Sequence, residues 1–304
     1  MKMNILISAN SRYVLPMISM LCSLFDTNPY EMDVYLMYND ISDDILDKLV
    51  KYCKQWGRKK LIPVYVDSSI TEGLPVTFRL PAEIYFKVLS AELLPDDLHT
   101  VLFMDLDMIV TKSLKEIFET DLKDYCFAAC FDIYAEVFEE NKKNIKRLGL
   151  PENHRYINSG LIYYNMNEVR KEKFGRKLIE QSAVNKDILM YPEQDMINKY
   201  WADRCLEIPW WKYNCPPIMY IMDQNEVNKG IFRPLNRDEM DSISDNFLNY
   251  AAAIRDQASV IHYIGESKPW NKERPSAETY EIFDIPFNNV ISKAAAIFEK
   301  VCNQ

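Results

Sequence analysis

The sequence predicts an α/β protein with a mainly parallel sheet flanked by helices. Short apolar segments alternate with longer amphipathic ones from the start of the chain, as in a series of β-α-β units with right-handed crossovers. The central segment, residues 100–104, is apolar after its first residue, which is typical of a strand buried on both faces. A length of 304 residues suffices for one large domain of this class.

The alternation is clearest in the first third of the chain. Strands are expected at residues 4–8, 32–37, 61–66 and 100–104, and helices at 14–25, 43–56 and 81–93. Ser42 is expected to cap the second of these helices and Gly57 to end it, while Pro81 suits the first position of the third. Because parallel strands end at one edge of a sheet, the loop after the first strand should open beside the residues that follow the central strand.

The rest of the chain is expected to contain three more strands. They are placed at residues 126–131, 156–165 and 259–263, with helices at 136–148, 167–181 and 192–201 and a short helix capped by Ser113. Asn167 is expected to cap the helix that it begins. Residues 210–214 form an aromatic cluster that could pack in the core or form a surface for a sugar ring. The tail from Ala277 is expected to form one or two short helices.

The composition is that of a soluble globular protein and excludes several functions. The net charge of −9 argues against nucleic acid as a partner and against strong attraction to anionic membranes. Seven cysteines without a Cys-x-x-Cys pattern suggest neither a disulfide framework nor a zinc site, so a reducing cytoplasm is expected. The seven glycines form neither of the usual glycine-rich phosphate loops. We also expect no signal peptide and no membrane-spanning helix.

The most informative residues are Asp105 and Asp107, which directly follow the central strand. Residues two apart on extended chain point to the same side, so both carboxylates should face the carboxyl edge of the sheet while Leu106 faces away. Two adjacent carboxylates repel each other unless a cation lies between them, which favours a divalent metal site. The alternative is an Asp-x-Asp turn that merely ends the strand.

Other polar residues are expected near the same edge, although each has an ordinary structural explanation. Asn10 could be a plain turn residue, Glu193 could complement the dipole of the helix it begins, and His262 could be a satisfied core histidine. A glycine within a strand often marks a close approach of a ligand or another backbone, which points to the notch Ser159-Gly160. The remaining candidates are Asp132 at a strand end, Asn158 before the notch, and the basic residues Arg79 and Lys87, which are usually solvated unless a site is anionic.

Taken in order, these segments resemble the retaining nucleotide-sugar glycosyltransferases of family 8, which include bacterial lipo-oligosaccharide galactosyl- and glucosyltransferases and the glycogenins. The resemblance covers roughly residues 4 to 275. It rests on the Asn10 loop, Arg79 with Tyr85 and Lys87, Phe103-Met104-Asp105-Leu106-Asp107, Asp132, Tyr156-Ile157-Asn158-Ser159-Gly160, Glu193-Gln194-Asp195, and His262-Tyr263-Ile264-Gly265 with Lys268-Pro269-Trp270. It implies a GT-A type fold with a Rossmann-like sheet, a catalytic domain at residues 1–275 and a helical tail at 276–304.

The resemblance further implies a UDP-sugar donor and a divalent metal. Asp105, Asp107 and His262 would be the protein ligands of Mn²⁺, with Mg²⁺ as the alternative, since Mn²⁺ accepts an imidazole more readily. Gly265 and Lys268 would hold the diphosphate. The other residues that the resemblance places around the nucleotide are Ser8, Asn10 at the uracil edge, Tyr13 against the base, Leu106 and Ser159, and those around the transferred sugar are Arg79, Lys87, Asp132, Asn158, Glu193 and Gln194.

The mechanism that the resemblance implies is transfer of galactose or glucose with retention at the anomeric carbon. The group placed nearest the reacting carbon is the amide of Gln194, which is a poor nucleophile compared with the carboxylate of a retaining glycosidase. We therefore expect a same-face displacement in which the departing phosphate oxygen helps to deprotonate the acceptor hydroxyl. Asn10, Arg12 and Glu193 depart from the residues common at these places, which leaves the sugar preference open.

Two other functions fit parts of the sequence. A haloacid-dehalogenase-type phosphatase also places Asp-x-Asp after an apolar strand, although usually near the N-terminus. A non-catalytic UDP-sugar-binding protein would fit the departures at Asn10 and Glu193. For the enzyme, we expect a glycan or lipid-linked saccharide acceptor, as in lipopolysaccharide biosynthesis, read by loops such as Trp210 to Met222. We expect a cytoplasmic location, or the inner face of the cell membrane with at most peripheral contact, and no nucleic-acid partner.

Overall fold

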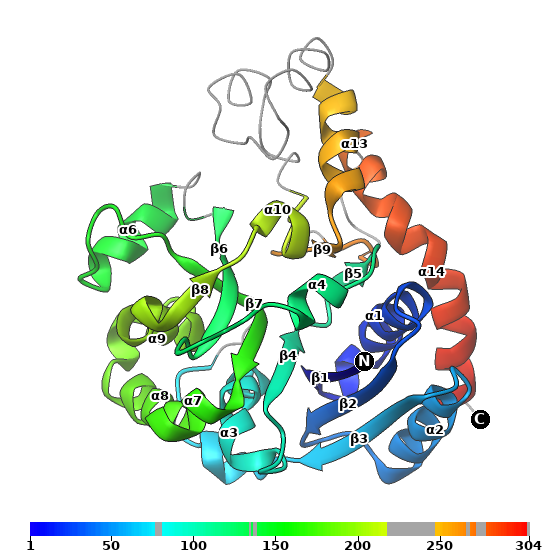
Figure 1. Ribbon diagram of the computed structural model, residues 1–304, viewed down its shortest axis with the longest axis horizontal. Helices are drawn as coiled ribbons and strands as arrows, with labels where there is room; N and C mark the ends of the chain where they lie inside the picture. The colour runs from blue at the N-terminus through cyan, green and yellow to red at the C-terminus, as the bar shows by residue number, and fades with distance from the viewer. Residues whose placement is uncertain are drawn as a thin grey trace.

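A seven-stranded sheet forms the centre of the molecule (Figure 1). The structure, a computed structural model, describes residues 1–76, 81–133, 135, 139–217, 247–265, 268–271 and 278–302. The strands in this part of the chain are β1 Lys2–Ser8, β2 Glu31–Tyr38, β3 Lys59–Tyr65, β4 Thr100–Met104, β5 Met108–Val110, β6 Phe127–Phe131, β7 Ile157–Asn165, β8 Cys205–Glu207 and β9 Val260–His262. Their order across the large sheet is β3-β2-β1-β4-β7-β6-β8, and β5 pairs with β9 in a separate two-stranded sheet.

The large sheet is mainly parallel, as predicted. Strands β3, β2, β1 and β4 run parallel, β8 runs parallel to β6, and β7 is antiparallel to both of its neighbours. The register Leu6↔Phe103 between β1 and β4 brings the residues after Ser8 and after Met104 to one edge of the sheet. This shared edge, expected from the β-α-β pattern, is where the candidate residues gather.

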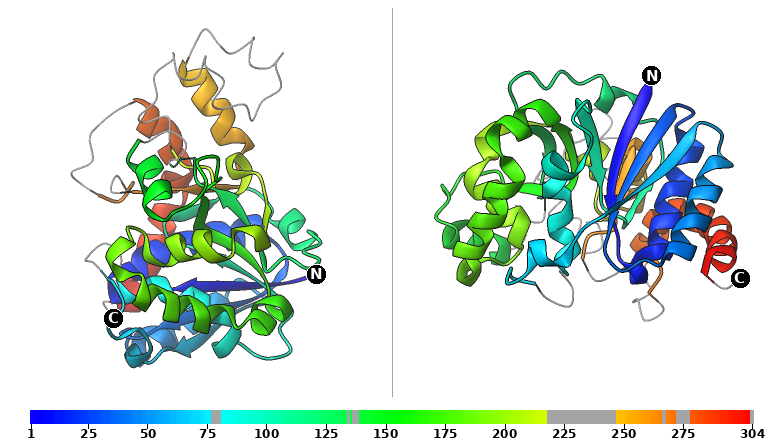
Figure 2. Two further views of the ribbon diagram at one scale, coloured as in Figure 1. Left: turned by 90° about the vertical axis from the view of Figure 1, so that its left-hand side faces the viewer. Right: turned by 90° about the horizontal axis from the view of Figure 1, so that it is seen from below.

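Helices cover both faces of the sheet (Figure 2). The α-helices are α1 Val14–Thr27, α2 Asp43–Lys54, α3 Ser90–Leu93, α4 Lys115–Phe118, α6 Glu139–Arg147, α7 Met166–Glu172, α8 Phe174–Val184, α9 Pro192–Tyr200, α10 Trp210–Tyr213, α13 Phe247–Gln257 and α14 Glu278–Cys302. Strand β1 shows the layering: Met3 and Ile5 pack with α1, α2 and α14 on one face, whereas Leu6 packs with α7, α8 and α9 on the other. Successive strand residues thus serve two hydrophobic cores.

Several helix boundaries differ from the expectation. Residues Ala82–Leu89 form a 3₁₀ helix that leads into α3, instead of one α-helix from Pro81. The helix expected at 167–181 is divided into α7 and α8, because Lys173 between them has a left-handed backbone with φ of 54°. The cap of α7 is Asn165, whose Oδ1 accepts from Glu168 N at 3.4 Å, and not Asn167. Short polar side chains two residues apart are hard to distinguish as caps from sequence alone.

After residue 200, the tail differs from the prediction, and the aromatic cluster shows one of the two roles considered for it. The tail forms one 25-residue helix, α14, which packs along α1 with Phe283 and Phe287 buried in the same core as β1. Helix α10 begins at Trp210, whose indole is buried 6.1 Å from the ring of Phe131. Of the two roles considered for the aromatic cluster, Trp210 therefore has the core role.

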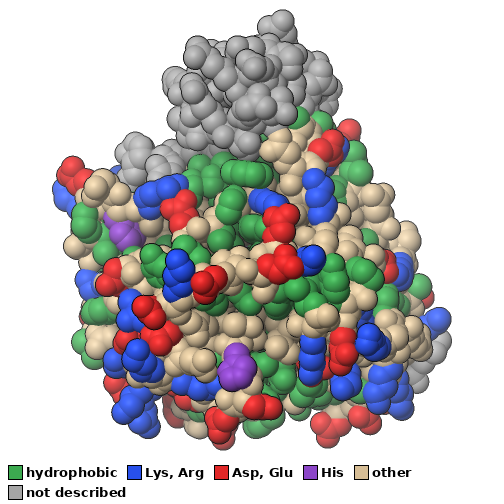
Figure 3. Space-filling view, in the orientation of Figure 1, with side chains coloured by type: hydrophobic (Ala, Val, Ile, Leu, Met, Phe, Trp, Pro, Cys, Tyr) green, Lys and Arg blue, Asp and Glu red, His purple; other side chains and the backbone are tan. Residues whose placement is uncertain are grey.

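The surface and the cysteines agree with the composition. Within the described ranges, no helix combines the length and the apolar character that a membrane span requires. The face in Figure 3 carries acidic and basic side chains interspersed. All seven cysteines are free, and burial raises the pKa of Cys53 and of Cys215 to about 12, so these thiols stay protonated at neutral pH.

Candidate functional site

Asp105, Asp107 and His262 converge at the carboxyl edge of the sheet. The two aspartates follow β4, and His262 ends β9, which pairs with β5 in the register Met108↔His262. His262 Nε2 lies 3.1 Å from Asp107 Oδ1 and 3.8 Å from Asp105 Oδ2. One ligand atom from each of the three residues lies within 4.8 Å of the other two. The structure thus brings together an imidazole and two carboxylates from strands far apart in the sequence.

Gly160 in β7 makes this convergence possible. A Cβ at this position would lie 2.3 Å from His262 Cε1 and 2.9 Å from Asp105 Oδ2, well inside van der Waals contact. Its carbonyl oxygen also accepts from Asp105 N at 2.8 Å. The sequence predicted that a ligand or another backbone would approach this glycine, whereas the groups that approach it are the imidazole ring and the Asp105 carboxylate. Because only glycine leaves room for the ring and the carboxylate together, and because such a donor set suits Mn²⁺, the residues fit a divalent ion.

The two aspartates differ in their electrostatic surroundings. Burial opposes ionisation of Asp107, but the Lys268 ammonium, in direct contact with Asp107 Oδ2, and the imidazole of His262 hold the pKa of Asp107 well below its usual range. Burial raises the pKa of Asp105, and the more distant Lys87 offsets this only in part. Lys268 Nζ also donates to Tyr263 O at 2.6 Å. Among the protein groups alone, the site therefore holds one firmly ionised carboxylate and one that is easier to protonate.

Lys87 links the aspartates to the N-terminus of α9. Its side chain is only 3% exposed, and Nζ lies 3.1 Å from Glu193 Oε1 and 3.6 Å from Asp105 Oδ1. It also donates to Ser159 O at 3.1 Å. Burial disfavours the charge, yet Asp105 and Glu193 outweigh burial and raise the pKa of Lys87. Lys87 is therefore a buried, charged member of the site and not a solvated surface residue.

A second polar group lies where α9 begins. Ser159 Oγ donates to Glu193 Oε1 at 2.9 Å, and Ser159 N donates to Gln194 Oε1 at 2.8 Å. Gln194 Nε2 and Asn158 Nδ2 donate to the same oxygen, Asp132 Oδ2, at 3.4 and 3.0 Å. A backbone N–H can only donate, so the amide oxygen of Gln194 must face Ser159. Glu193 is buried and paired, which a residue that merely complements the helix dipole need not be.

Asp195 fixes the start of α9. Its Oδ2 accepts from Met190 N at 2.7 Å and from Tyr191 N at 3.0 Å, while its Oδ1 accepts from Asn144 Nδ2 at 2.7 Å and from the hydroxyl of Tyr156. Burial raises the pKa of Asp195 despite these donors. Asp195 thus holds the turn that presents the two preceding residues to the site.

The residues expected around the nucleotide are near the same edge but make fewer contacts. Asn10 follows β1 and is buried, and its Oδ1 accepts from Arg12 N at 3.1 Å, so the turn role considered for it is present. Tyr13 is 37% exposed, and Ser8 is the last residue of β1. Leu106 packs its side chain in the core, which leaves only its backbone for a ligand.

Of two further expected residues, the structure describes one, Gly265, and does not describe the other, Arg79. Gly265, in the loop after β9, has φ of 86° with open space where a side chain would be. Arg79 lies outside the described residues.

One contact of His262 was not predicted from the sequence: Asn214 Oδ1 lies 2.6 Å from His262 Nδ1. Its only sequence signal was its place at the end of the aromatic cluster.

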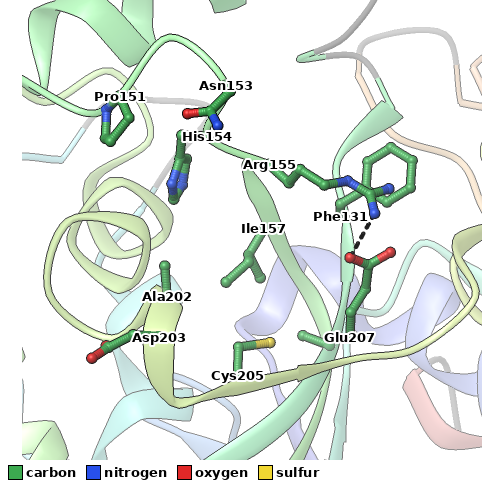
Figure 4. Close-up of a pocket in the computed structure, with 11 residues that line it drawn as sticks. Phe131, Pro151, Asn153, His154, Arg155, Ile157, Ala202, Asp203, Cys205 and Glu207 are labelled. Atoms are coloured by element: carbon green, nitrogen blue, oxygen red, sulfur yellow. Dashed lines mark hydrogen bonds and ion pairs between the residues drawn. The ribbon is translucent and has the colours of Figure 1, made fainter.

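A separate pocket of about 380 Å³ opens beside β6 and β8 (Figure 4). Arg155 extends across it, 4.0 Å from the ring centroid of Phe131 and 2.8 Å from Glu207 Oε2. His154 Nε2, in the same wall, lies 3.0 Å from Asn198 Oδ1. None of the lining residues is among the candidates above, so the pocket is distinct from the carboxylate and imidazole cluster.

Comparison with known proteins gives concordant results. Residues 4–274 match the family described as Glycosyl transferase family 8. A lipopolysaccharide 1,2-glucosyltransferase of Escherichia coli is 30% identical over 265 residues, or 83% of this chain and 70% of that protein. The glycosyltransferase GlyF of Streptococcus pneumoniae is 23% identical over 278 residues, or 89% of this chain and 58% of its own length. The crystal structure of the galactosyltransferase LgtC with donor and acceptor sugar analogs superposes with a TM-score of 0.75 at 19% identity over 96% of both chains, which confirms the GT-A type fold.

Proposed function

The chain belongs to glycosyl transferase family 8, and from this premise we propose that it transfers a hexose from a UDP-sugar to a saccharide acceptor, with retention at the anomeric carbon and with Mn²⁺ as the metal. The observation that carries the proposal is the convergence of Asp105, Asp107 and His262 beside the buried pair Lys87 and Glu193. Mg²⁺ is the alternative metal.

The diphosphate side of the site would be formed by the residues nearest Asp107. A divalent cation held by Asp105, Asp107 and His262 would supply Lewis-acid assistance by neutralising charge on the departing UDP. Lys268 would place its ammonium beside the diphosphate, since it already contacts Asp107. Gly265 would offer its backbone N–H, since among the described residues no atom lies within 4 Å of where its Cβ would be.

The nucleoside would lie at the end of β1. We assign Ser8, Asn10, Tyr13 and the backbone of Leu106 to it, because these residues follow β1 and β4 at one edge of the sheet. The Asn10 oxygen has a second lone pair with which it can accept from the uracil N–H. Tyr13 is exposed enough to lie against the base.

The transferred hexose would be held by two oriented carboxylates. Glu193 and Asp132 can accept from sugar hydroxyls, and each is fixed by a neighbour: Lys87 holds Glu193, and Asn158 holds Asp132. Such preorganised acceptors position the anomeric carbon without further reorganisation. We propose galactose or glucose as the hexose, because the relatives include a glucosyltransferase and a galactosyltransferase. From the sequence we add Arg79 to this group.

The amide of Gln194 supports a same-face displacement over a double displacement. Its oxygen is held by Ser159 and its nitrogen faces Asp132, so no side-chain carboxylate takes this position. Ser159 Oγ also lies 3.2 Å from this oxygen, but its single proton is donated to Glu193 Oε1 at 2.9 Å. The amide oxygen therefore keeps a lone pair that can stabilise positive charge at the anomeric carbon. In the displacement, the bond from the acceptor oxygen to this carbon forms as the bond to phosphate breaks, and the hydroxyl proton passes to the departing phosphate oxygen.

The acceptor is proposed to be a glycan or a lipid-linked saccharide. The first relative described above acts on lipopolysaccharide, which favours a similar pathway here. We propose that the protein works in the cytoplasm or at the inner face of the cell membrane, with at most peripheral membrane contact and without nucleic acid. The net charge of −9 supports these last two points.

A donor screen tests the proposal. UDP-hexoses with Mn²⁺ are compared by thermal shift, and UDP release is then measured for those that stabilise the protein. We expect slow UDP release from UDP-glucose or UDP-galactose, stimulated by Mn²⁺ and abolished by chelation, and a product that keeps the donor's anomeric configuration by NMR. Binding without any turnover across an acceptor screen would indicate the binding protein instead. Phosphate release from simple esters would indicate the phosphatase.

A further inference from the structure

The imidazole of His262 has a second partner on the side away from the aspartates. Asn214 Oδ1 lies 2.6 Å from His262 Nδ1, while Nε2 of the same ring lies 3.1 Å from Asp107 Oδ1. Both Asn214 and His262 are buried, at 3% and 4% exposed. A carbonyl oxygen can only accept, so this contact requires the proton on Nδ1.

We propose that Asn214 is a positioning residue that fixes the Nδ1–H tautomer of His262 and so leaves the Nε2 lone pair free to bind a divalent cation. This inference rests on the proposed function, since it assigns His262 to the metal. A metal-binding histidine usually donates its other ring N–H to a fixed acceptor, which sets both the tautomer and the ring orientation. Asn214 provides that acceptor within the described residues.

The backbone around Asn214 is tied to β9, so the amide cannot drift from the ring. Ser259 N donates to Lys212 O at 2.6 Å, Cys215 N donates to Val260 O at 3.1 Å, and His262 N donates to Cys215 O at 2.9 Å. These bonds flank Asn214 on both sides and hold it beside His262. The amide oxygen is thus placed by the fold and not by a mobile loop.

Gly160 confines the ring from another side. A Cβ there would lie 2.9 Å from His262 Nδ1 as well as 2.3 Å from Cε1, so the ring is in close contact with the backbone of β7. The two residues have different effects. Gly160 lets the ring approach the aspartates, and Asn214 decides which nitrogen faces them.

Three variants separate positioning from a merely structural role. Asn214→Leu keeps the size of the side chain but removes the acceptor, whereas Asn214→Asp keeps an oxygen acceptor for Nδ1–H. Asn165→Leu is the matched control, because it removes the part-buried amide oxygen that caps α7, and α7 contributes no residue to the site. The Mn²⁺ affinity of each full-length variant is measured without nucleotide, by electron paramagnetic resonance of the free ion. The tautomer of His262 is measured in the metal-free protein by long-range ¹⁵N–¹H NMR.

We expect Asn214→Leu to weaken Mn²⁺ binding by about 10- to 100-fold, Asn214→Asp to restore it to within a few fold, and Asn165→Leu to leave it unchanged. The wild-type spectrum should show a proton on Nδ1, whether or not Nε2 is also protonated toward the Asp107 carboxylate, and that of Asn214→Leu should show a smaller population with Nδ1–H. Equal Mn²⁺ affinity in the wild type and Asn214→Leu, or a wild-type ring without a proton on Nδ1, would overturn the inference alone. A wild type that binds no Mn²⁺, with or without UDP, would overturn the proposed metal site, and the inference would fail with it.

Discussion

Gly160→Ala is the substitution whose effect the structure defines most closely. The new methyl carbon would lie 2.3 Å from His262 Cε1, whereas carbon atoms in contact lie about 3.5 Å apart. The ring would therefore have to move by roughly 1.2 Å, more than twice the roughly 0.5 Å that a functional constellation tolerates. The same methyl would lie 2.9 Å from Asp105 Oδ2, so the carboxylate must also give way. We expect Mn²⁺ affinity and UDP release to fall at least about tenfold.

The assay must distinguish loss of the site from loss of the fold. Overpacking of this kind typically costs about 1–3 kcal/mol, so the variant should remain folded with a lower melting temperature. Gly57→Ala is a suitable control: it forces alanine into a backbone with φ of 78°, at a cost of about 1–2 kcal/mol, with open space around the added carbon and no contact with the site. Mn²⁺ binding of wild-type strength in Gly160→Ala would refute the reasoning, because the ring would then have another way to reach the aspartates.

Three further predictions concern α9 and its partners. Lys87→Met should lower the free energy of unfolding by about 3 kcal/mol in urea titrations, because Glu193 and Asp105 lose a buried partner. Gln194→Ala should slow UDP-sugar turnover by more than about tenfold, or 1.4 kcal/mol, if the amide stabilises the transition state. For Asp195, burial raises the folded-state pKa above the unfolded value of 3.8, so the folded protein binds this proton more tightly. Its contribution to stability is fully present below 3.8 and declines as the pH rises through the folded pKa. The stability lost in Asp195→Asn, measured by urea unfolding, should therefore be larger at about pH 4 than at about pH 7.

Each of these has an outcome that contradicts it. If Lys87→Met had the same free energy of unfolding as the wild type, the buried ion pairs of Lys87 with Glu193 and Asp105 would make no net contribution to stability. A loss below tenfold in Gln194→Ala, with donor affinity intact, would argue against the amide as the stabilising group. If the deficit of Asp195→Asn grew with pH instead, the ionised form of Asp195 would be the one that the fold favours. Lys199→Met can serve as a shared control on α9, since its ammonium donates to Leu148 O at 2.5 Å and lies over the ring of Tyr200, away from the site residues.

The sequence predicted the first half of the site because its signals are local. The apolar run before Asp105 and the spacing to Asp107 are enough to place two carboxylates after a buried strand. The β-α-β pattern then placed the end of β1 at the same edge, and the register of β1 with β4 agrees. Such periodicities depend only on residues close together in the sequence, so they can be recognised without knowing the tertiary structure.

The second half of the site depends on contacts between distant segments. The residues after Asp107 form β5, for which no strand was predicted, and the pairing of β5 with β9 is what brings His262 to the aspartates. Asn214 reaches His262 through bonds between residues 212–215 and β9. Nothing in the local pattern distinguishes His262 from a core histidine, so only the resemblance to a family suggested its role. The pairing of strands far apart in sequence has no local signature.

The carboxylates and the lysines of the site differ in number, and this difference bears on which ligands the site can bind. Four carboxylates face two ammonium groups in the described site, namely Asp105, Asp107, Asp132 and Glu193 against Lys87 and Lys268. Burial is the main cause of the raised pKa of Asp105, the Asp107 and Glu193 carboxylates raise it further, and Lys87 offsets these effects only in part. A diphosphate would meet net negative charge in a protein that is already at −9. A divalent cation removes the excess locally, and its ligands would be the carboxylates whose repulsion is otherwise uncompensated. Under the proposed function, metal and nucleotide are therefore expected to bind together more tightly than either does alone.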